Sequence, residues 1–296
     1  PGLLLQDAWR YCFVTAGRPR AAVVNDALWC LIQAATLVIL LRAPQVSLTA
    51  IMVWWAGAGV LAGLIGCAQA RATPALKSIM TWLRKHRELS SRYALEYTVA
   101  TGSSQATVLA LGAIAGLAAL GAIRGTQVFF GPIGVLFGGA YLTFGAEGAR
   151  LRAHPERLNR LMLVCSGALF VVCAASLAIG IVLPQQIGRG LFGDTWDTAR
   201  QVLIPVGIAF LGNCVAAGGV VGLRALAAAR ASLRARLLGL PVAVAAPVIG
   251  ALWGSHGFAI GLAIASWAAA AIWWRQFVRA LAEDLPPADV MVDLAV

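Results

Sequence analysis

The sequence predicts an all-α integral membrane protein with about eight transmembrane helices and part of a ninth. Of its 296 residues, 60% are hydrophobic and only 12% are charged, and the mean hydropathy is +0.82. A soluble globular domain averages about 25% charged residues, so this composition is typical of a chain that lies in a bilayer. The apolar residues also form runs long enough to cross about 30 Å of hydrocarbon at about 1.5 Å per helical residue.

The elements follow from these runs. Residues 1–16 resemble the end of a helix that begins upstream, and because the chain starts at Pro1 without an initiator Met, we expect that an N-terminal portion is missing. The eight expected spans cover residues 25–42, 48–68, 95–120, 126–148, 159–184, 198–222, 235–253 and 256–275. Short loops separate most of them, and a tail follows residue 279.

The charged residues predict the orientation of these spans. The net charge of +11 falls between apolar runs instead of on one basic face with interleaved aromatic residues, which argues against nucleic acid as a partner. If loops are assigned alternately to the two sides, all Lys and Arg fall on one side except Arg42, Arg124, Arg189 and Arg200. By the positive-inside rule the basic side is cytoplasmic. The sequence therefore predicts a multi-pass protein of the cytoplasmic membrane with a cytoplasmic C-terminus.

The longest polar interval, residues 69–94, is expected to be a basic linker between two helical bundles. Thr73 and Pro74 are typical of a helix start. Ile79, Met80 and Leu83 share one helical face, and Trp82 suits the headgroup level. We interpret this interval as an amphipathic helix on the cytoplasmic surface, with a solvated charged loop as the alternative.

One longer loop on the non-cytoplasmic side and a faint repeat complete the organisation. Residues 184–197 contain Asp194 and Thr195, a capping pattern that restarts a helix, and we expect Trp196 to lie at the outer interface. Sliding the sequence by 212 residues places residues 16–18 over 228–230, in each case before a two-span hairpin. Duplicated halves are common in secondary transporters.

Polar side chains within the spans are the candidate functional residues, because the bilayer makes them costly unless they face protein or water. We expect Asp7 and Arg10 to pair, since they are three residues apart on one helix. Asp26 and Glu96 each open a span, and for Asp26 and Glu147 we favour a capping or snorkelling role. A hydrated central cavity is the expected setting of Arg10, Gln105, Arg124, Gln127 and Asn213.

The sequence gives no sign of an enzyme, a metal centre or a cofactor. His86, His154 and His256 have no ligand partner at i+4, and no phosphate-binding glycine loop with a Lys occurs. The six cysteines are scattered in apolar surroundings, so we expect buried, inert thiols. ATP hydrolysis by this chain and a membrane-embedded transferase are therefore disfavoured.

Several short strings resemble bacterial polysaccharide flippases of the multidrug, oligosaccharidyl-lipid and polysaccharide exporter superfamily. Residues 5–11 (LQDAWRY), 16–19 (AGRP) and 25–29 (NDALW) resemble the region from the fourth to the fifth helix of that family. Residues 125–134 (GTQVFFGPIG) and 191–196 (LFGDTW) resemble its eighth helix and the entry to its tenth. The resemblance extends over nearly the whole chain as a diffuse pattern, without an invariant signature.

The resemblance implies a two-lobe, inverted-V transporter bundle that lacks its first helices. Residues 1–68 would then be the end of the first lobe, 69–94 the cytoplasmic linker, 95–279 a complete second six-helix lobe and 280–296 a cytoplasmic tail. It also implies a basic cavity for a lipid pyrophosphate, and Arg10 and Arg124 are the nearest matches in this sequence.

The expected function is the flipping or export of a lipid-linked saccharide across the cytoplasmic membrane by alternating access, in cell-envelope polysaccharide biosynthesis. Asp26 and Glu96 are the candidate groups for coupling to an ion gradient. The alternatives are a multidrug exporter of the same superfamily and a non-transporting membrane scaffold that recruits glycan-synthesis proteins. The expected partners are membrane lipid and the lipid-linked saccharide.

Overall fold

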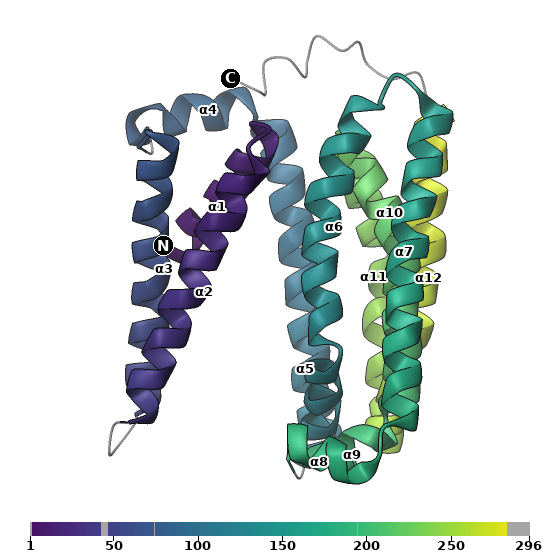
Figure 1. The fold of residues 1–296 in the computed structure, drawn as a ribbon. Helices are drawn as coiled ribbons and strands as arrows, with labels where there is room; N and C mark the ends of the chain where they lie inside the picture. The colour runs from purple at the N-terminus through teal and green to yellow at the C-terminus, as the bar shows by residue number, and fades with distance from the viewer. Residues whose placement is uncertain (1, 43–46, 74, 194, 283–296) are drawn as a thin grey trace. The chain divides into compact units, whose positions relative to one another are not determined.

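The computed structural model is all-α in the residues that it describes, which are 2–42, 47–73, 75–193 and 195–282. Six segments in them are long and apolar enough to cross a membrane: residues 19–40, 48–70, 87–129, 155–182, 203–225 and 229–282. The last of these contains two helices separated by a short turn. The predicted class, a helical multi-pass membrane protein, is confirmed at this level (Figure 1).

The chain divides into two compact units at the junction of Lys85 and His86. The first unit contains α1 (Gly2–Thr15), α2 (Pro19–Leu41), α3 (Leu48–Ala70), a 3-10 turn η1 (Leu76–Ser78) and α4 (Ile79–Lys85). Gly59, Gly63 and Gly66 of α3 pack against α1, and a Cβ at Gly66 would overlap the ring of Trp9. These glycines therefore let the two helix backbones approach closely.

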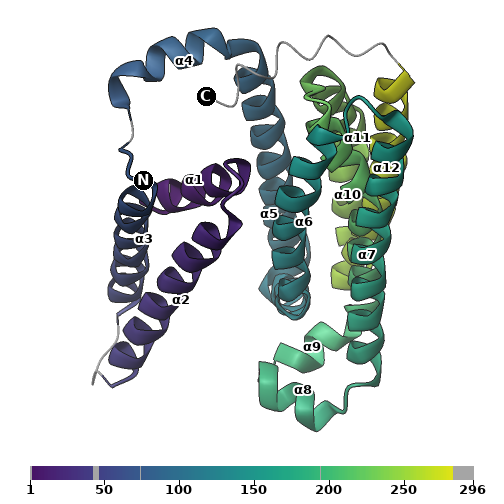
Figure 2. The ribbon, with the colours of Figure 1, turned by 45° about the horizontal axis from the view of Figure 1, so that its top comes forward.

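The second unit is a bundle of long helices closed at one end by two short ones (Figures 1 and 2). In order these are α5 (Arg87–Phe129), α6 (Gly131–Arg150), α7 (Pro155–Val182), α8 (Gln185–Phe192), α9 (Thr195–Gln201), α10 (Leu203–Ala225), α11 (Ala229–Gly250), the 3-10 turn η2 (Ala251–Trp253) and α12 (Gly254–Ala282). Helices α8 and α9 cross the end of the bundle that is opposite to the α6–α7 turn.

Helix α10 is the core of this bundle, since most of its residues are buried between α7 and α12. Small residues make this possible: Gly219 lies against the backbone of Trp273, and Gly222 lies against the ring of Phe277. Ser166 of α7 fixes the register, because its Oγ donates to Val215 O at 2.9 Å and accepts from Gly218 N at 3.0 Å.

The observed bounds of α5 differ from the predicted span of residues 95–120 at both ends. It begins at Arg87, and not near residue 95, because Glu88 and Arg92 form a helical i,i+4 ion pair at 3.7 Å that continues the helix into the polar interval. The backbone leaves helical geometry at Gly116, with φ 85° and ψ 171°, and the helix then resumes to Phe129. Arg124, predicted to lie in a short loop, is therefore in a helical segment.

The polar interval forms a helix over part of its length. Helix α4 has no buried residues, and Ile79, Met80, Trp82 and Leu83 are all exposed. Pro74, half of the predicted start signal, lies outside the described residues. The ends of the interval belong to neighbouring helices, since α3 continues to Ala70 and α5 begins at Arg87. The membrane-surface location of α4 stays a prediction.

The segment near residue 190 is helical and not a loop. It contains α8 and α9, and Asp194 of the proposed cap lies outside the described residues. Trp196, expected at the outer interface, is 1% exposed. Its ring stacks on Phe192 at 5.4 Å and contacts Phe129 at 5.8 Å between ring centroids. Trp196 is therefore covered by aromatic side chains of the protein, whereas the sequence predicts contact with the lipid interface.

The expectation of uniformly buried cysteines is also wrong. Cys165, Cys173 and Cys214 are buried in the second unit, as predicted, but Cys12 and Cys30 are exposed and Cys67 is partly exposed. These three lie on the helices of the smaller first unit, which has fewer neighbours to cover them.

Candidate functional site

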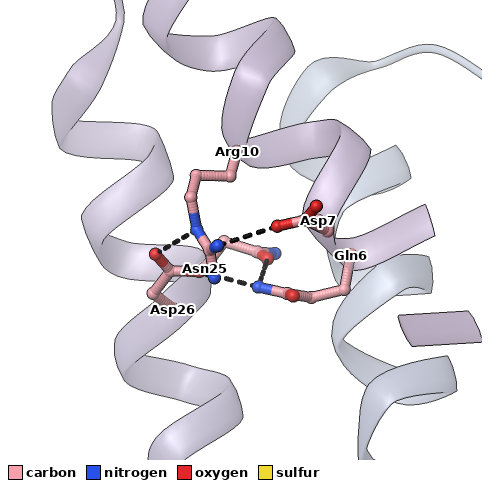
Figure 3. Close-up of polar contacts among 5 residues, drawn as sticks. All are labelled: Gln6, Asp7, Arg10, Asn25 and Asp26. Atoms are coloured by element: carbon pink, nitrogen blue, oxygen red, sulfur yellow. Dashed lines mark hydrogen bonds and ion pairs between the residues drawn. The ribbon is translucent and has the colours of Figure 1, made fainter. Parts of the chain in front are cut away.

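The first unit contains a charged cluster centred on Arg10 of α1 (Figure 3). Its guanidinium donates from Nε to Asp26 Oδ2 at 2.8 Å and from Nη2 to Asp26 Oδ1 at 3.0 Å. It also donates from Nη1 to Asp7 Oδ1 at 2.8 Å, which confirms the predicted pairing of Asp7 with Arg10. Two-point contact with one carboxylate fixes the orientation of the guanidinium as well as its charge.

Two buried amides extend this cluster to all three long helices. Gln6 Nε2 donates to Asp26 Oδ1 at 2.7 Å, and Gln6 and Asn25 are only 2% and 1% exposed. Asn25 Nδ2 in turn donates to Ala62 O and to Gln69 Oε1, each at 3.1 Å. The polar groups of α1, α2 and α3 therefore form one connected network.

The charges in this network do not cancel. One guanidinium faces two carboxylates, so the cluster carries a net negative charge when Asp7 and Asp26 are both ionised. The side chains of Arg10, Asp26 and Asp7 are 29%, 34% and 48% exposed. Such groups are costly against lipid tails. The partly exposed carboxylate edge of the cluster therefore carries its excess negative charge.

The second unit contains another charged cluster, centred on Glu96 of α5. The side chain is 2% exposed, and Oε1 accepts from Arg224 Nη2 of α10 at 3.1 Å. Oε2 accepts from Ser232 Oγ of α11 at 2.5 Å. Arg224 also lies over the ring of Tyr93 at 5.1 Å. Both carboxylate oxygens are thus paired, and three helices meet at one buried anion.

A third charged group lies on the short helices α8 and α9. Asp197 accepts from Arg189 Nη2 at 2.5 Å and from Gln185 Nε2 at 2.8 Å. These two hydrogen bonds, that from Arg189 first, hold the pKa of Asp197 below its ordinary value. The group is at the surface, so it stabilises the local α8–α9 turn and has no shielded volume in which to hold a ligand.

The structure brings some predicted site residues together and separates others. Arg124 Nη1 donates to Gln127 Oε1 at 3.0 Å at an exposed position. Gln105 and Asn213 have exposed side chains, and neither has a hydrogen-bond partner within the described ranges. Arg10 lies in the first unit, whereas Gln105, Arg124, Gln127 and Asn213 lie in the second.

The sequence predicts that Asp26 and Glu96 open their spans, but in the structure neither lies at the start of its helix. Helix α2 begins at Pro19 and α5 at Arg87, so both carboxylates lie about two turns or more inside a helix. Asp26 is therefore the acceptor of an interhelical ion pair. Of the two roles that we favoured for it, capping is wrong, because the N-cap of α2 is Arg18, and snorkelling stays a prediction. Glu147, in contrast, pairs with Arg150 at 3.1 Å near the exposed end of α6, in keeping with its expected place.

Gln6, Arg224 and Ser232 are among the partners in these clusters that were not identified from the sequence. Gln6 lies four residues before Arg10, on the same helical face, and this spacing is a signal that was available. Arg224 and Ser232 gave no such signal, because they lie 128 and 136 residues from Glu96. Across the described residues, no group of three or more His, Cys, Asp or Glu side chains is placed to hold a metal ion.

Comparison with known proteins gives no assignment: no family model, no curated protein and no solved structure matches this chain.

Proposed function

We propose that this chain is part of a membrane transporter that moves a lipid-linked saccharide across the cytoplasmic membrane by alternating access. The proposal concerns transport without a covalent step, and it places the linker and the C-terminus in the cytoplasm. Its substrate class follows from the resemblance of the quoted strings to polysaccharide flippases. The physical support comes from the two clusters of ionised side chains.

The observation that carries the proposal is the Arg10–Asp26 pair with its amide network. A polar cluster between membrane-spanning helices is expected only where the helices face water or other protein. Gln6 and Asn25 anchor its inner side, and the charged side chains stay partly exposed on the other. A hydrated path past α1 and α2 accounts for this distribution, and polar substrates require such a path.

The finer architecture belongs to the same proposal. We propose eight spans and part of a ninth, because α6 extends alongside α7 and the last apolar segment folds back at Ala251–Trp253. The residues up to Lys85 would belong to a first lobe, and those from His86 would form the second lobe. The two units recognised at Lys85 and His86 support this division.

Charge supplies a mechanism for the coupling. Protonation of Asp26 would remove the ion pair with Arg10 and leave the guanidinium held by Asp7 alone, which is a weaker and more exposed contact. Glu96 has the corresponding position in the second unit, since its protonation would weaken the contact with Arg224. Each carboxylate would thus link an ion gradient to the packing of three helices.

A second candidate, a cation-coupled multidrug exporter, is favoured by one observation. The cluster around Arg10 has two carboxylates and one guanidinium. A net negative site attracts organic cations better than it attracts a pyrophosphate. The non-transporting scaffold stays an alternative without a structural observation in its favour.

The test uses the full-length gene that encodes this chain, with Arg10→Ala compared with Arg20→Ala. Arg20 is an exposed arginine near the start of α2, so its loss changes the net charge equally. We expect Arg10→Ala to abolish surface glycan while the protein remains in the membrane, and Arg20→Ala to leave glycan unchanged. Normal glycan in both strains would contradict the assignment of Arg10, and cation efflux lost only in Arg10→Ala would support the drug exporter.

A further inference from the structure

The hairpin of α11 and α12 has an apolar groove on its surface that the proposed transport path does not use. Its volume is about 450 Å³, within the range of about 300–1,000 Å³ that small-molecule sites occupy. The groove is lined by Ala246, Ile249, Gly250, Trp253, His256, Gly257, Ile260, Gly261 and Ile264.

Glycines make the floor of this groove. Gly250 and Gly257 touch through their backbones, and Gly261 lies against the backbone carbonyl of Ala246. A Cβ at any of the three would overlap the facing helix, so the two helices meet without side chains between them. The side chains of Ile249, Ile260 and Ile264 form the walls of the groove, and these residues are 44% to 56% exposed.

The length of the groove matches one leaflet of a bilayer. Its lining begins at Trp253 in the η2 turn and continues on α12 from His256 to Ile264; the helical part alone is about 12 Å long at 1.5 Å per residue. The hydrocarbon core is about 30 Å thick, so each leaflet contributes about 15 Å. The groove begins at the η2 turn, where the chain leaves one helix and enters the next. With this turn at the membrane boundary, the groove would extend to about the midplane.

The chemistry of the lining changes along this length. Trp253, 71% exposed, and His256 lie at the turn, where a Trp suits the headgroup level. His256 is the one ionisable residue in the lining, and the deeper residues are Ala, Gly and Ile. A polar end followed by an apolar channel corresponds to the chemistry of a lipid molecule.

We propose that this groove binds one acyl chain of a bilayer glycerophospholipid, with the headgroup beside Trp253 and His256. A helix of a second copy would cover the groove without filling it, because a helix about 10 Å wide and 16 Å long has a volume of roughly 1,200 Å³. The groove has a little over a third of that volume. A single extended chain is the occupant whose shape and polarity match.

The test is photo-crosslinking of the purified protein in bilayers that contain phosphatidylglycerol with a diazirine midway along one acyl chain. We expect residues 246–264 to be labelled several-fold more per residue than the exposed valines of α7, Val164, Val171 and Val182, which also face outward. Equal labelling of the two regions would overturn the proposal, as would crosslinks that join two protein chains through residues 246–264.

A matched pair of variants on α11 separates the groove from the general surface. Ala246→Phe fills the groove, whereas Ala245→Phe adds the same ring at an exposed position that does not line it. We expect Ala246→Phe to lose the excess labelling and Ala245→Phe to keep it. Retained labelling in Ala246→Phe would overturn the proposal, and Ile264→Trp gives the same test if Ala246→Phe does not fold.

Discussion

Arg224 Nη2 lies 3.1 Å from the buried carboxylate of Glu96, although 128 residues separate the two along the chain. The contact joins an early turn of α5 to the last turn of α10, and Ser232 adds the first turn of α11. One carboxylate therefore joins the end of α10 and the start of α11 to an early turn of α5. A buried anion with both oxygens paired makes this junction sensitive to any change of charge.

The first prediction concerns the stability of this junction. Glu96→Ala leaves Arg224 and Ser232 without their acceptor, and we expect it to lower the free energy of unfolding of the second unit by about 3 kcal/mol, as for other broken buried pairs. Glu88→Ala is the control, because Glu88 is 69% exposed and pairs at 3.7 Å; its cost should be about 0.5 kcal/mol. Denaturation in detergent measures both, and equal losses would contradict the assignment of Glu96 as the central anion.

The second prediction distinguishes the two carboxylates around Arg10. Asp26 accepts from both Arg10 and Gln6, whereas Asp7 accepts one bond and is 48% exposed. We expect Asp26→Asn to abolish transport and to destabilise the first unit by about 2 kcal/mol. Asp7→Asn should cost less than about 1 kcal/mol and leave transport reduced at most several-fold. Transport assays and thermal unfolding check this, and the reverse order would refute the central place of Asp26.

The third prediction uses two glycines of α8. A Cβ at Gly188 would overlap the buried ring of Trp196, whereas a Cβ at Gly190 would meet nothing within 4 Å. Gly188→Ala should therefore destabilise the α8–α9 segment by about 1–3 kcal/mol through overpacking. Gly190→Ala should be neutral or stabilising by up to about 1 kcal/mol, because it reduces the entropy of the unfolded chain. Trp fluorescence during unfolding reports both.

The fourth prediction is a pH dependence on the same helices. The pKa of Asp197 is lowered in the folded state, so its contribution to stability is complete above the ordinary aspartate pKa of about 3.9 and is lost as the pH falls through the lowered value. The protection of residues 185–201 against hydrogen exchange, relative to the intrinsic rate at each pH, should therefore decrease below about pH 4 in the wild type. Asp197→Asn should exchange faster at neutral pH and lose this acid dependence, and an unchanged profile would contradict the role of the Arg189 contact.

The membrane class was predictable because it depends on local composition, and the ends of helices were not. Expected spans such as 48–68 and 159–184 correspond to α3 and α7, since an apolar run is its own signal. Arg87, Glu88 and Arg92 hid the start of α5, because their polarity masked the helical ion pair that they form. Gly116 ends one stretch of α5 by its positive φ, a property that its small-residue surroundings did not reveal.

The repeat shows how register depends on backbone geometry. The sequence aligned the two turns with a shift of 212, but the hydrogen bonds align Gly17 with Ala227, a shift of 210. Arg18 N donates to Phe13 O at 2.8 Å, and Ala228 N donates to Leu223 O at 2.9 Å. Gly17 and Ala227 have φ of 70° and 52°. Both turns are thus the same helix end, a Schellman-type cap, formed once with Gly and once with Ala, and residue identity alone could not reveal it.

The candidate site was predictable only for contacts within one helix, and not for contacts between helices. The pairing of Asp7 with Arg10 follows from their spacing on one helix. The bonds from Arg10 to Asp26 and from Asn25 to Gln69 join different helices, so they depend on packing that a single sequence does not specify. Gln105 and Asn213 were expected to line a central cavity, but both are exposed. A polar residue within an apolar run does not indicate which side of the helix faces the rest of the protein.

The most direct test of the proposed function is the distribution of lipid-linked glycan precursors across the cytoplasmic membrane. The full-length gene is deleted, and the precursors are labelled with an impermeant probe applied to each face of the membrane. We predict that precursors accumulate on the cytoplasmic face, and that wild-type but not Arg10→Ala protein reverses this. An unchanged distribution in the deletion strain would contradict a role in flipping lipid-linked saccharides.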